Sequence, residues 1–147
     1  MPPMTVTKPA TAGNLALFLG FVEFVADRHG LAAESAHRLK LVVEEAVTNV
    51  VHHGYAGREA GDLTLSADLD GDAVVVTLED HGAAFDPADA PPADLDSDWR
   101  ERSVGGLGWH LIRELTDAVA YAAGDPAAGR PNRLTLRVGR APRGGTS

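Results

Sequence analysis

Apolar side chains recur at every third or fourth position in two segments near the start of the chain. The first segment has them at Leu15, Phe18, Leu19, Val22 and Val25, and the second at Leu39, Val42, Val43, Ala46, Val47 and Val50. This spacing places the apolar side chains on one face of a helix. The pattern therefore predicts a first helix that stops at His29-Gly30 and a second over about 34–53 that ends at Gly54.

Alternating apolar and polar residues, typical of strands, follow these segments. Residues 63–69 read LTLSADL and residues 73–80 read AVVVTLED, and the intervening Asp70-Gly71 is a hairpin signal. A second pair of strands is expected at 119–123 (VAYAA) and 133–138 (RLTLRV), on either side of a turn-rich segment. The sequence also predicts a short strand at 4–8.

A third helix is expected between the two pairs of strands. It opens at Gly105 and carries inward-facing apolar residues at Leu107, Leu111, Ile112 and Leu115. The order helix, helix, hairpin, loop, helix, hairpin predicts an α/β (α+β) two-layer sandwich, with a mixed, mainly antiparallel sheet and the helices packed on one face. Repeated βαβ units are absent, so a dinucleotide-binding architecture has no support.

Length and composition limit the possible classes of protein. The 147 residues suit a single domain over 1–147, with an acidic loop at 86–104 and a glycine- and arginine-rich tail at 139–147 that we expect to be disordered. There is no cysteine, and no apolar run is long enough to span a membrane. The net charge of -8 disfavours nucleic acid as a partner. The first residues lack the pattern of a secretory signal, so a cytoplasmic location is expected.

The second helix carries a first candidate site. Glu45 and Asn49 are four residues apart and therefore share a face at the edge of the apolar stripe. A sheltered carboxylate there can accept a proton, and an amide oxygen can bind Mg²⁺. The alternative is a hydrogen-bonded pair beside the core. His52 and His53 could join the site, although their spacing favours capping or packing over metal binding.

Two further motifs follow. Asp80 ends a strand and Gly82 comes two residues later, so the carboxylate could accept a hydrogen bond from an exocyclic amine of a base; an ordinary turn is the alternative. Gly105, Gly106 and Gly108 open the third helix, where uncovered N–H groups suit a phosphate, although the glycines could also serve only flexibility. No G-K-[ST] follows, so this is not a P-loop.

The order and spacing of these motifs resemble a known family. E-x-x-x-N on a helix, D-x-G after a hairpin strand, then a lid at 86–104 and G-x-G at a helix start are similar to the nucleotide site of the GHKL (Bergerat-fold) ATPases. Within them, VVEEAVTNVVHHGY, LEDHGAAFDP, GGLGWHLIRELTD and NRLTLRV resemble the solo HATPase_c domains of RsbW-type anti-sigma-factor serine-protein kinases, over about 10–138.

The resemblance implies roles for the matching residues and two cofactors, ATP and Mg²⁺. It makes Glu45 the general base, Asn49 the magnesium ligand and Asp80 the reader of adenine. The remaining nucleotide contacts that it suggests are His53, Gly82, Gly105, Gly106, Leu107, Gly108 and Thr135. One position departs from the family pattern D-x-G-x-G, because Ala84 replaces the second glycine.

The resemblance also implies an activity and partners. It predicts transfer of the ATP γ-phosphoryl group to a serine of a STAS-type anti-sigma-factor antagonist, and sequestration of a sigma factor. The first helix and a preceding strand form the dimer region in this family, so a homodimer is expected. The alternative is a noncatalytic regulatory module that binds its partner with or without ATP, which the missing glycine favours.

Overall fold

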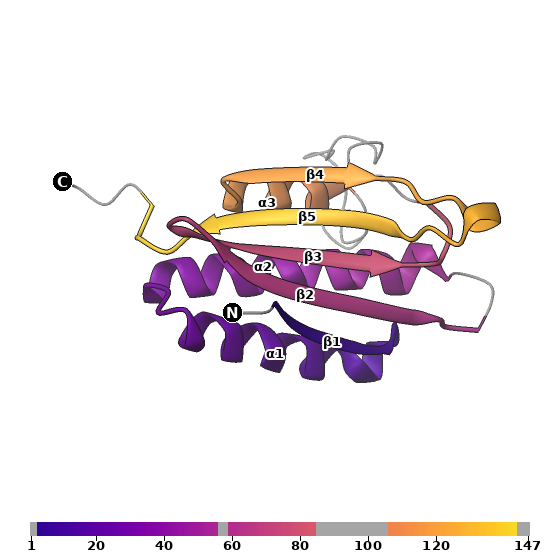
Figure 1. Cartoon of the computed structure of the whole chain (residues 1–147), viewed down its shortest axis with the longest axis horizontal. Coiled ribbons are helices and arrows are strands. Elements are labelled where there is room, and N and C mark those ends of the chain that lie inside the picture. Colours follow the sequence, from indigo (N-terminus) through magenta and orange to yellow (C-terminus); the bar gives the residue numbers. More distant parts are fainter. Residues whose placement is uncertain (1–2, 56–58, 85–105, 144–147) are drawn as a thin grey trace.

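The computed structural model describes residues 3–55, 59–84 and 106–143, with 106–109 described by their backbone (Figure 1). Its strands are β1 (Met4–Pro9), β2 (Asp62–Asp70), β3 (Ala73–Asp80), β4 (Ala118–Ala122) and β5 (Asn132–Gly139). Its helices are α1 (Leu15–Arg28), α2 (Ala33–Asn49) and α3 (Gly106–Leu115), with a π-helical turn at Val50–Gly54 and 3-10 turns at Ala12–Asn14 and Pro126–Ala128.

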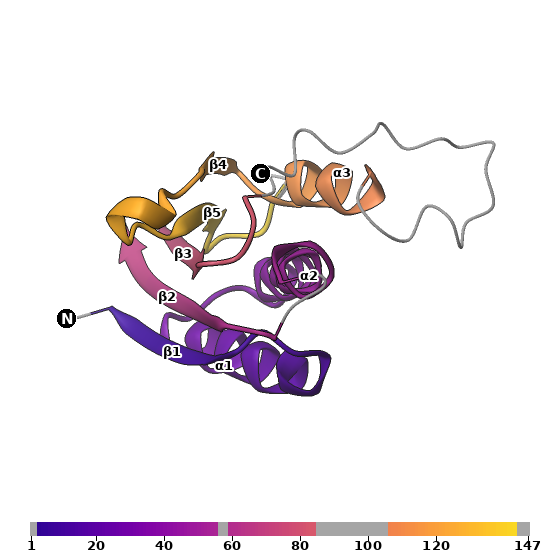
Figure 2. The same cartoon turned by 90° about the vertical axis from the view of Figure 1, so that its right-hand side faces the viewer.

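Within these ranges the strands form one antiparallel sheet in the order β1-β2-β3-β5-β4. All three helices lie on the same side of the sheet (Figure 2). This arrangement confirms the predicted two-layer sandwich. The order puts β3 and β5 side by side at the centre, so the last residue of β3, Asp80, lies opposite the first residue of β5, Asn132.

The core fills the space between the helices and the inner face of the sheet. Side chains alternate between the two faces of a strand, and the large apolar side chains that β3 and β5 bury are Val74, Val76, Leu78, Leu134, Leu136 and Val138. The helices bury Phe18, Val22, Val25, Leu39, Val42, Val43, Val47 and Ile112 against them. The apolar faces that the sequence pattern predicts are therefore the faces that pack.

The ends of the first two helices follow the local signals. Gly30 has a φ of 66°, and the N–H groups of Gly30 and Leu31 donate to the carbonyls of Asp27 and Ala26. This pairing closes the last turn of α1 and needs a residue that tolerates positive φ. The second helix continues from α2 into the π-helical turn and ends at Gly54, as predicted.

The predicted disorder of the tail is wrong for residues 139–143. Gly139 belongs to β5, and the carbonyl of Arg140 accepts a hydrogen bond from the N–H of Ala32 at 2.9 Å. The remaining residues 144–147 and the predicted lid at 86–104 lie outside the described residues. In the part of the chain that is described, no helix is long and apolar enough to cross a membrane.

Candidate functional site

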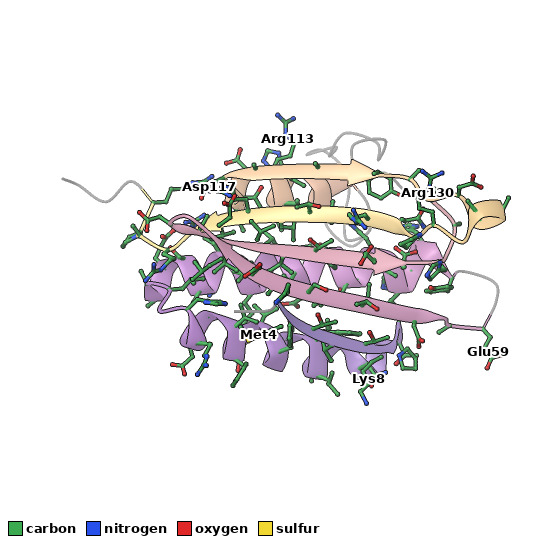
Figure 3. The ribbon with its side chains drawn as sticks, in the orientation of Figure 1. Met4, Lys8, Glu59, Arg113, Asp117 and Arg130 are labelled. Carbon is green, nitrogen blue, oxygen red and sulfur yellow. The ribbon has the colours of Figure 1, made fainter. Side chains whose placement is uncertain are left out.

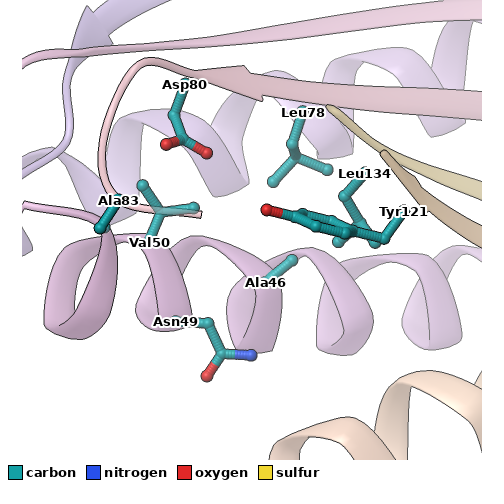
Figure 4. Close-up of a pocket in the computed structure, with 9 residues that line it drawn as sticks. Ala46, Asn49, Val50, Leu78, Asp80, Ala83, Tyr121 and Leu134 are labelled. Carbon is teal, nitrogen blue, oxygen red and sulfur yellow. The ribbon is translucent and has the colours of Figure 1, made fainter. Parts of the chain in front are cut away.

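A pocket lies between α2 and the end of the sheet formed by β3, β5 and β4 (Figure 4). Its lining residues are Ala46, Asn49, Val50, Gly54, Leu78, Asp80, Ala83, Tyr121 and Leu134. Ala46, Val50 and Gly54 are spaced by four residues and so lie on one side of the helix and its π-helical turn. Because these residues are small or short, the helix leaves room for a flat, mainly apolar ligand.

Asp80 is the charged group of this pocket and is only 8% exposed. Its Oδ1 accepts hydrogen bonds from the N–H of Gly82 at 2.9 Å and from Nδ2 of Asn132 at 3.1 Å. A buried carboxylate is tolerated only when such donors replace water. The two donors to Oδ1 hold the side chain in one orientation. A carboxylate held in this way can accept a hydrogen bond from an exocyclic amine of a base.

Asn132 is a site residue that the sequence did not reveal. It is 5% exposed, its Nδ2 also donates to the carbonyl of Gly82 at 2.9 Å, and its Oδ1 accepts from the N–H of Gly124 at 2.8 Å. Asn132 therefore ties together the end of β3, the loop that follows it and the β4–β5 connection. The only signal in the sequence is a polar residue at the start of a strand, because its partner Asp80 is 52 positions away.

Thr135 does not lie at the pocket, contrary to the expectation from the resemblance. Its neighbours Leu134 and Leu136 are buried towards the helices, so Thr135 lies on the opposite, helix-free face of the sheet. There it is paired in register with Thr77 of β3. Thr135 is three positions after Asn132, the residue of β5 that bonds to Asp80, and an odd offset puts the two side chains on opposite faces of the strand.

A glycine is needed at position 82 for a reason different from the one expected. A Cβ at this position would lie 2.2 Å from the carbonyl oxygen of Gly54, and the N–H of Ala83 donates to that same oxygen at 2.6 Å. Glycine thus allows the loop after β3 to pack against the end of the π-helical turn. No described non-glycine residue has a positive φ, so Ala84 occupies the second-glycine position without backbone strain.

Asn49 lies at the rim of the pocket, and its side chain points away from Asp80 and Tyr121 (Figure 4). It is 7% exposed, and its Nδ2 has no hydrogen-bond partner in the described ranges. A buried amide without a partner fits a ligand, and its oxygen suits Mg²⁺, which usually takes one or two protein ligands together with phosphates and waters. Among the described residues, no group of three or more His, Asp or Glu is placed to hold a metal ion.

Glu45 lies one helical turn before Asn49 on the same face of α2 and is half-buried. It is not one of the residues that line the pocket. Burial raises the pKa of the Glu45 carboxyl, and the neighbouring charge of Glu44 raises it further. A carboxylate with a raised pKa is a stronger base, as proton abstraction from a hydroxyl requires.

The other candidate contacts are only partly placed. His53 lies in the π-helical turn, is partly buried and is not among the lining residues; burial lowers its pKa, as does the neighbouring His52. Gly106, Leu107 and Gly108 form the first turn of α3, as the resemblance requires of its helix start. Gly105 lies outside the described residues.

Known proteins match this chain closely enough to test the resemblance. A model of the histidine kinase-like ATPase domain matches residues 8–138. The serine-protein kinase RsbW of Listeria monocytogenes serovar 1/2a is 32% identical over 120 residues, which cover 79% of this chain and 76% of that protein. The RsbW of Bacillus cereus strain B4264 is 30% identical over 115 residues, 76% of this chain and 71% of that protein.

A solved structure agrees with the fold. The crystal structure of the RsbU and RsbW domains of a Mycobacterium tuberculosis protein matches with a TM-score of 0.64 at 21% identity. The match covers 99% of this chain and 35% of the longer chain. The resemblance read from the motifs is therefore confirmed for the family and the fold.

The role of Asn132 can be tested by its replacement with alanine. We expect Asn132→Ala to weaken binding of ATP by roughly tenfold or more, because a hydrogen bond to a charged group contributes about 1.5–3 kcal/mol. Calorimetric titration with ATP measures this. Thr135→Ala, on the same strand but the other face, is the control and should bind as the wild type does. Equal losses in both variants would contradict the assignment.

The raised pKa of Glu45 predicts a pH-dependent stability. As the pH rises, this carboxyl loses its proton in the unfolded chain around its ordinary pKa of 4.5, and in the folded chain only at a higher pH. The folded state is therefore favoured at low pH, and this advantage is lost as the pH rises through the raised value. At neutral pH we expect Glu45→Gln to have a higher melting temperature than the wild type. This difference in melting temperature should disappear at about pH 4.

Thermal unfolding of the ligand-free protein across this pH range measures the effect. Glu44→Gln, one residue earlier on the same helix, controls for the loss of one negative charge. A difference between Glu45→Gln and the wild type that stays constant with pH would mean that burial of the charge is not its cause.

Proposed function

Because the chain belongs to the histidine kinase-like ATPase domain family, and within it to the RsbW serine-protein kinases, we propose that it transfers the γ-phosphoryl group of ATP to a serine of a partner protein. The observation that carries this proposal is the pairing of Glu45 and Asn49 on one face of α2, beside a pocket that ends in Asp80. A module that only binds nucleotide has no evident need for the carboxylate.

The pocket would receive the adenine base. Its apolar walls are formed by Ala46 and Val50 on one side and by Leu78 and Leu134 on the other. Asp80 would accept a hydrogen bond from the exocyclic amine, an interaction that a base with a carbonyl at that position could not make. The phosphates would then extend past Asn49 towards the first turn of α3, where helix N–H groups favour negative charge.

The side chains near the phosphates would supply the chemistry. The Glu45 carboxylate would take the proton from the serine hydroxyl while the serine oxygen forms a bond to the γ-phosphorus. The bond between that phosphorus and the β–γ bridging oxygen would break, and ADP would leave. Asn49 would hold Mg²⁺ against the phosphates, and the ion would neutralise charge on the transferred group. Since this transition state is loose, positioning by the protein is its main contribution.

The partners we propose follow from the family. A STAS-type antagonist would present the serine, and a sigma factor would be bound by the same chain. The relatives' name, serine-protein kinase RsbW, supports a serine acceptor. A second copy of this chain is a further partner, because α1 exposes Leu17 at 40% and Phe24 at 59%, two turns apart on one face.

Two variants separate nucleotide binding from phosphoryl transfer. We expect Asn49→Ala to lose the Mg²⁺-dependent part of ATP binding, measured by calorimetric titration with and without the ion. We expect Glu45→Ala to keep ATP binding but to lose transfer to the antagonist by about 10²- to 10⁴-fold, because the general base is removed.

Glu44→Ala is the matched control and should transfer phosphate as the wild type does. Transfer is measured by phosphoserine mass spectrometry of the antagonist after incubation with ATP. Equal transfer by Glu45→Ala would remove its role as base. An antagonist that the wild type binds without modifying it would favour the noncatalytic binding module.

The proposed dimer predicts a change in mass. We expect the wild-type chain to sediment as a dimer, at twice the 15.4 kDa of one chain. The variant Phe24→Ser should sediment as a monomer of 15.4 kDa, because it removes an exposed aromatic contact. Ala16→Ser, an exposed position elsewhere on α1, is the control. A single mass for the wild type would exclude this dimer.

A further inference from the structure

Two arginine side chains hold the C-terminal end of α3. Arg143 donates from Nη1 to the carbonyl of Glu114, and from Nη2 to the carbonyl of Thr116 at 2.7 Å. Arg38 of α2 donates from Nη1 to the carbonyl of Leu115 at 2.8 Å. The last carbonyls of a helix lack partners within the helix and carry its negative dipole end, so two cations there satisfy both requirements.

Arg143 belongs to a segment that is itself attached to α2. We call residues 140–143 the strap; they follow β5 and run past the start of α2. The strap contacts the start of α2 and Ala32, the residue just before it. The hydrogen bonds are Ala32 N–H to the Arg140 carbonyl at 2.9 Å, Ser35 Oγ to the Ala141 carbonyl at 2.9 Å, and Arg143 N–H to Glu34 Oε2 at 2.9 Å. The strap therefore joins the end of the sheet to both α2 and α3.

Glu34 connects the two arginines. Its Oε1 accepts from Nε of Arg38 at 2.7 Å, while its Oε2 accepts the Arg143 N–H. That backbone hydrogen bond, and then the Arg38 guanidinium, hold the pKa of Glu34 below its usual value. Arg38 is only 5% exposed, so its donors must be matched inside the protein. A buried arginine that bridges two helices is a built feature and not a chance surface contact.

A further ion pair lies at the same end of α3. Arg143 Nη2 is 3.6 Å from Oδ1 of Asp117, the second residue after α3, and Asp117 Oδ2 accepts from the N–H of Gly139 at 2.6 Å. Figure 3 shows Asp117 near the end of β5. The end of α3, the start of β4 and the end of β5 are thus held in one network with the strap.

The opposite end of α3 carries Gly106 and Gly108, the proposed phosphate contacts. The helix has 10 residues and is therefore about 15 Å long, so a small tilt at its held end moves its first turn. The pocket for the base is instead lined from α2, the π-helical turn, the loop after β3 and the sheet, with no described residue of α3 or the strap. The strap can therefore act on the phosphates without acting on the base.

We propose that the strap, through Arg143 and together with Arg38, positions α3 so that its first turn meets the phosphates of the nucleotide. Arg143 and Arg38 are positioning residues in this view, since they contact only the far end of the helix. The proposal rests on the proposed function, because it takes a phosphate-bearing nucleotide as the ligand. It assigns the strap a part in affinity for the phosphates and none in recognition of adenine.

The test compares two ligands in the full-length chain. We expect Arg143→Ala to weaken binding of Mg-ATP by roughly tenfold, about 1.4 kcal/mol, and to leave binding of adenosine unchanged within measurement error. Calorimetric titration gives both affinities. Arg137→Ala is the matched control: Arg137 is also a partly exposed arginine, but it bonds to Asp70 at 2.6 Å on the sheet, and both ligands should bind to this variant as to the wild type.

A second variant reaches the same network from an exposed position. Glu34→Ala removes the acceptor shared by Arg143 and Arg38 and should weaken ATP but not adenosine. Equal losses for both ligands, or no loss for ATP in either variant, would overturn the role of the strap. If the wild type bound neither ligand, the proposed function would fail and this proposal with it. Binding of ATP by the wild type therefore distinguishes a failure of the strap's role from a failure of the proposed function.

Discussion

The hydrogen bond between Asp80 and Asn132 is the interaction on which the rest of the site depends. A carboxylate buried at the end of a central strand is costly unless donors replace its water, and Asn132 supplies one from the strand opposite. The same amide holds the carbonyl of Gly82 and the N–H of Gly124. One side chain therefore sets the loop after β3, the β4–β5 connection and the acceptor that faces the pocket. The close approach of Gly82 to Gly54 follows from this placement, since only a glycine leaves room for it.

A single helix provides both kinds of chemistry at the site. The spacing of four residues at Ala46, Val50 and Gly54 forms an apolar wall, while the same spacing at Glu45 and Asn49 brings two polar groups to the adjoining face. Polarity therefore changes around the helix, from an apolar wall suited to a base to a polar edge suited to phosphate and a metal ion. The raised pKa of Glu45 is a direct result of that intermediate burial.

The strap begins just after the residues that the family model matches. The family model matches residues 8–138, and the strap begins after β5 ends at Gly139. Arg143 of the strap donates to the carbonyl of Thr116, and Arg38 of α2 donates to the carbonyl of Leu115. The hydrogen bonds of the strap to Ala32, Ser35 and Glu34 hold this short segment, rich in arginine and proline, against the helices.

Local patterns in the sequence determined the elements, because helix and strand periodicities depend on neighbouring residues alone. The three helices, both hairpins, Gly30 and Gly54 as helix ends, and the E-x-x-x-N, D-x-G and G-x-G motifs were all readable in this way. The tertiary structure decided which polar residue of β5 bonds to Asp80: it is Asn132, because the antiparallel pairing of β3 with β5 sets these two residues opposite each other. It also decided that the tail is bound, since the partners of Arg143 are at least 26 positions away along the chain. Contacts between distant residues depend on how the layers stack, and the sequence pattern of either partner carries no record of the other.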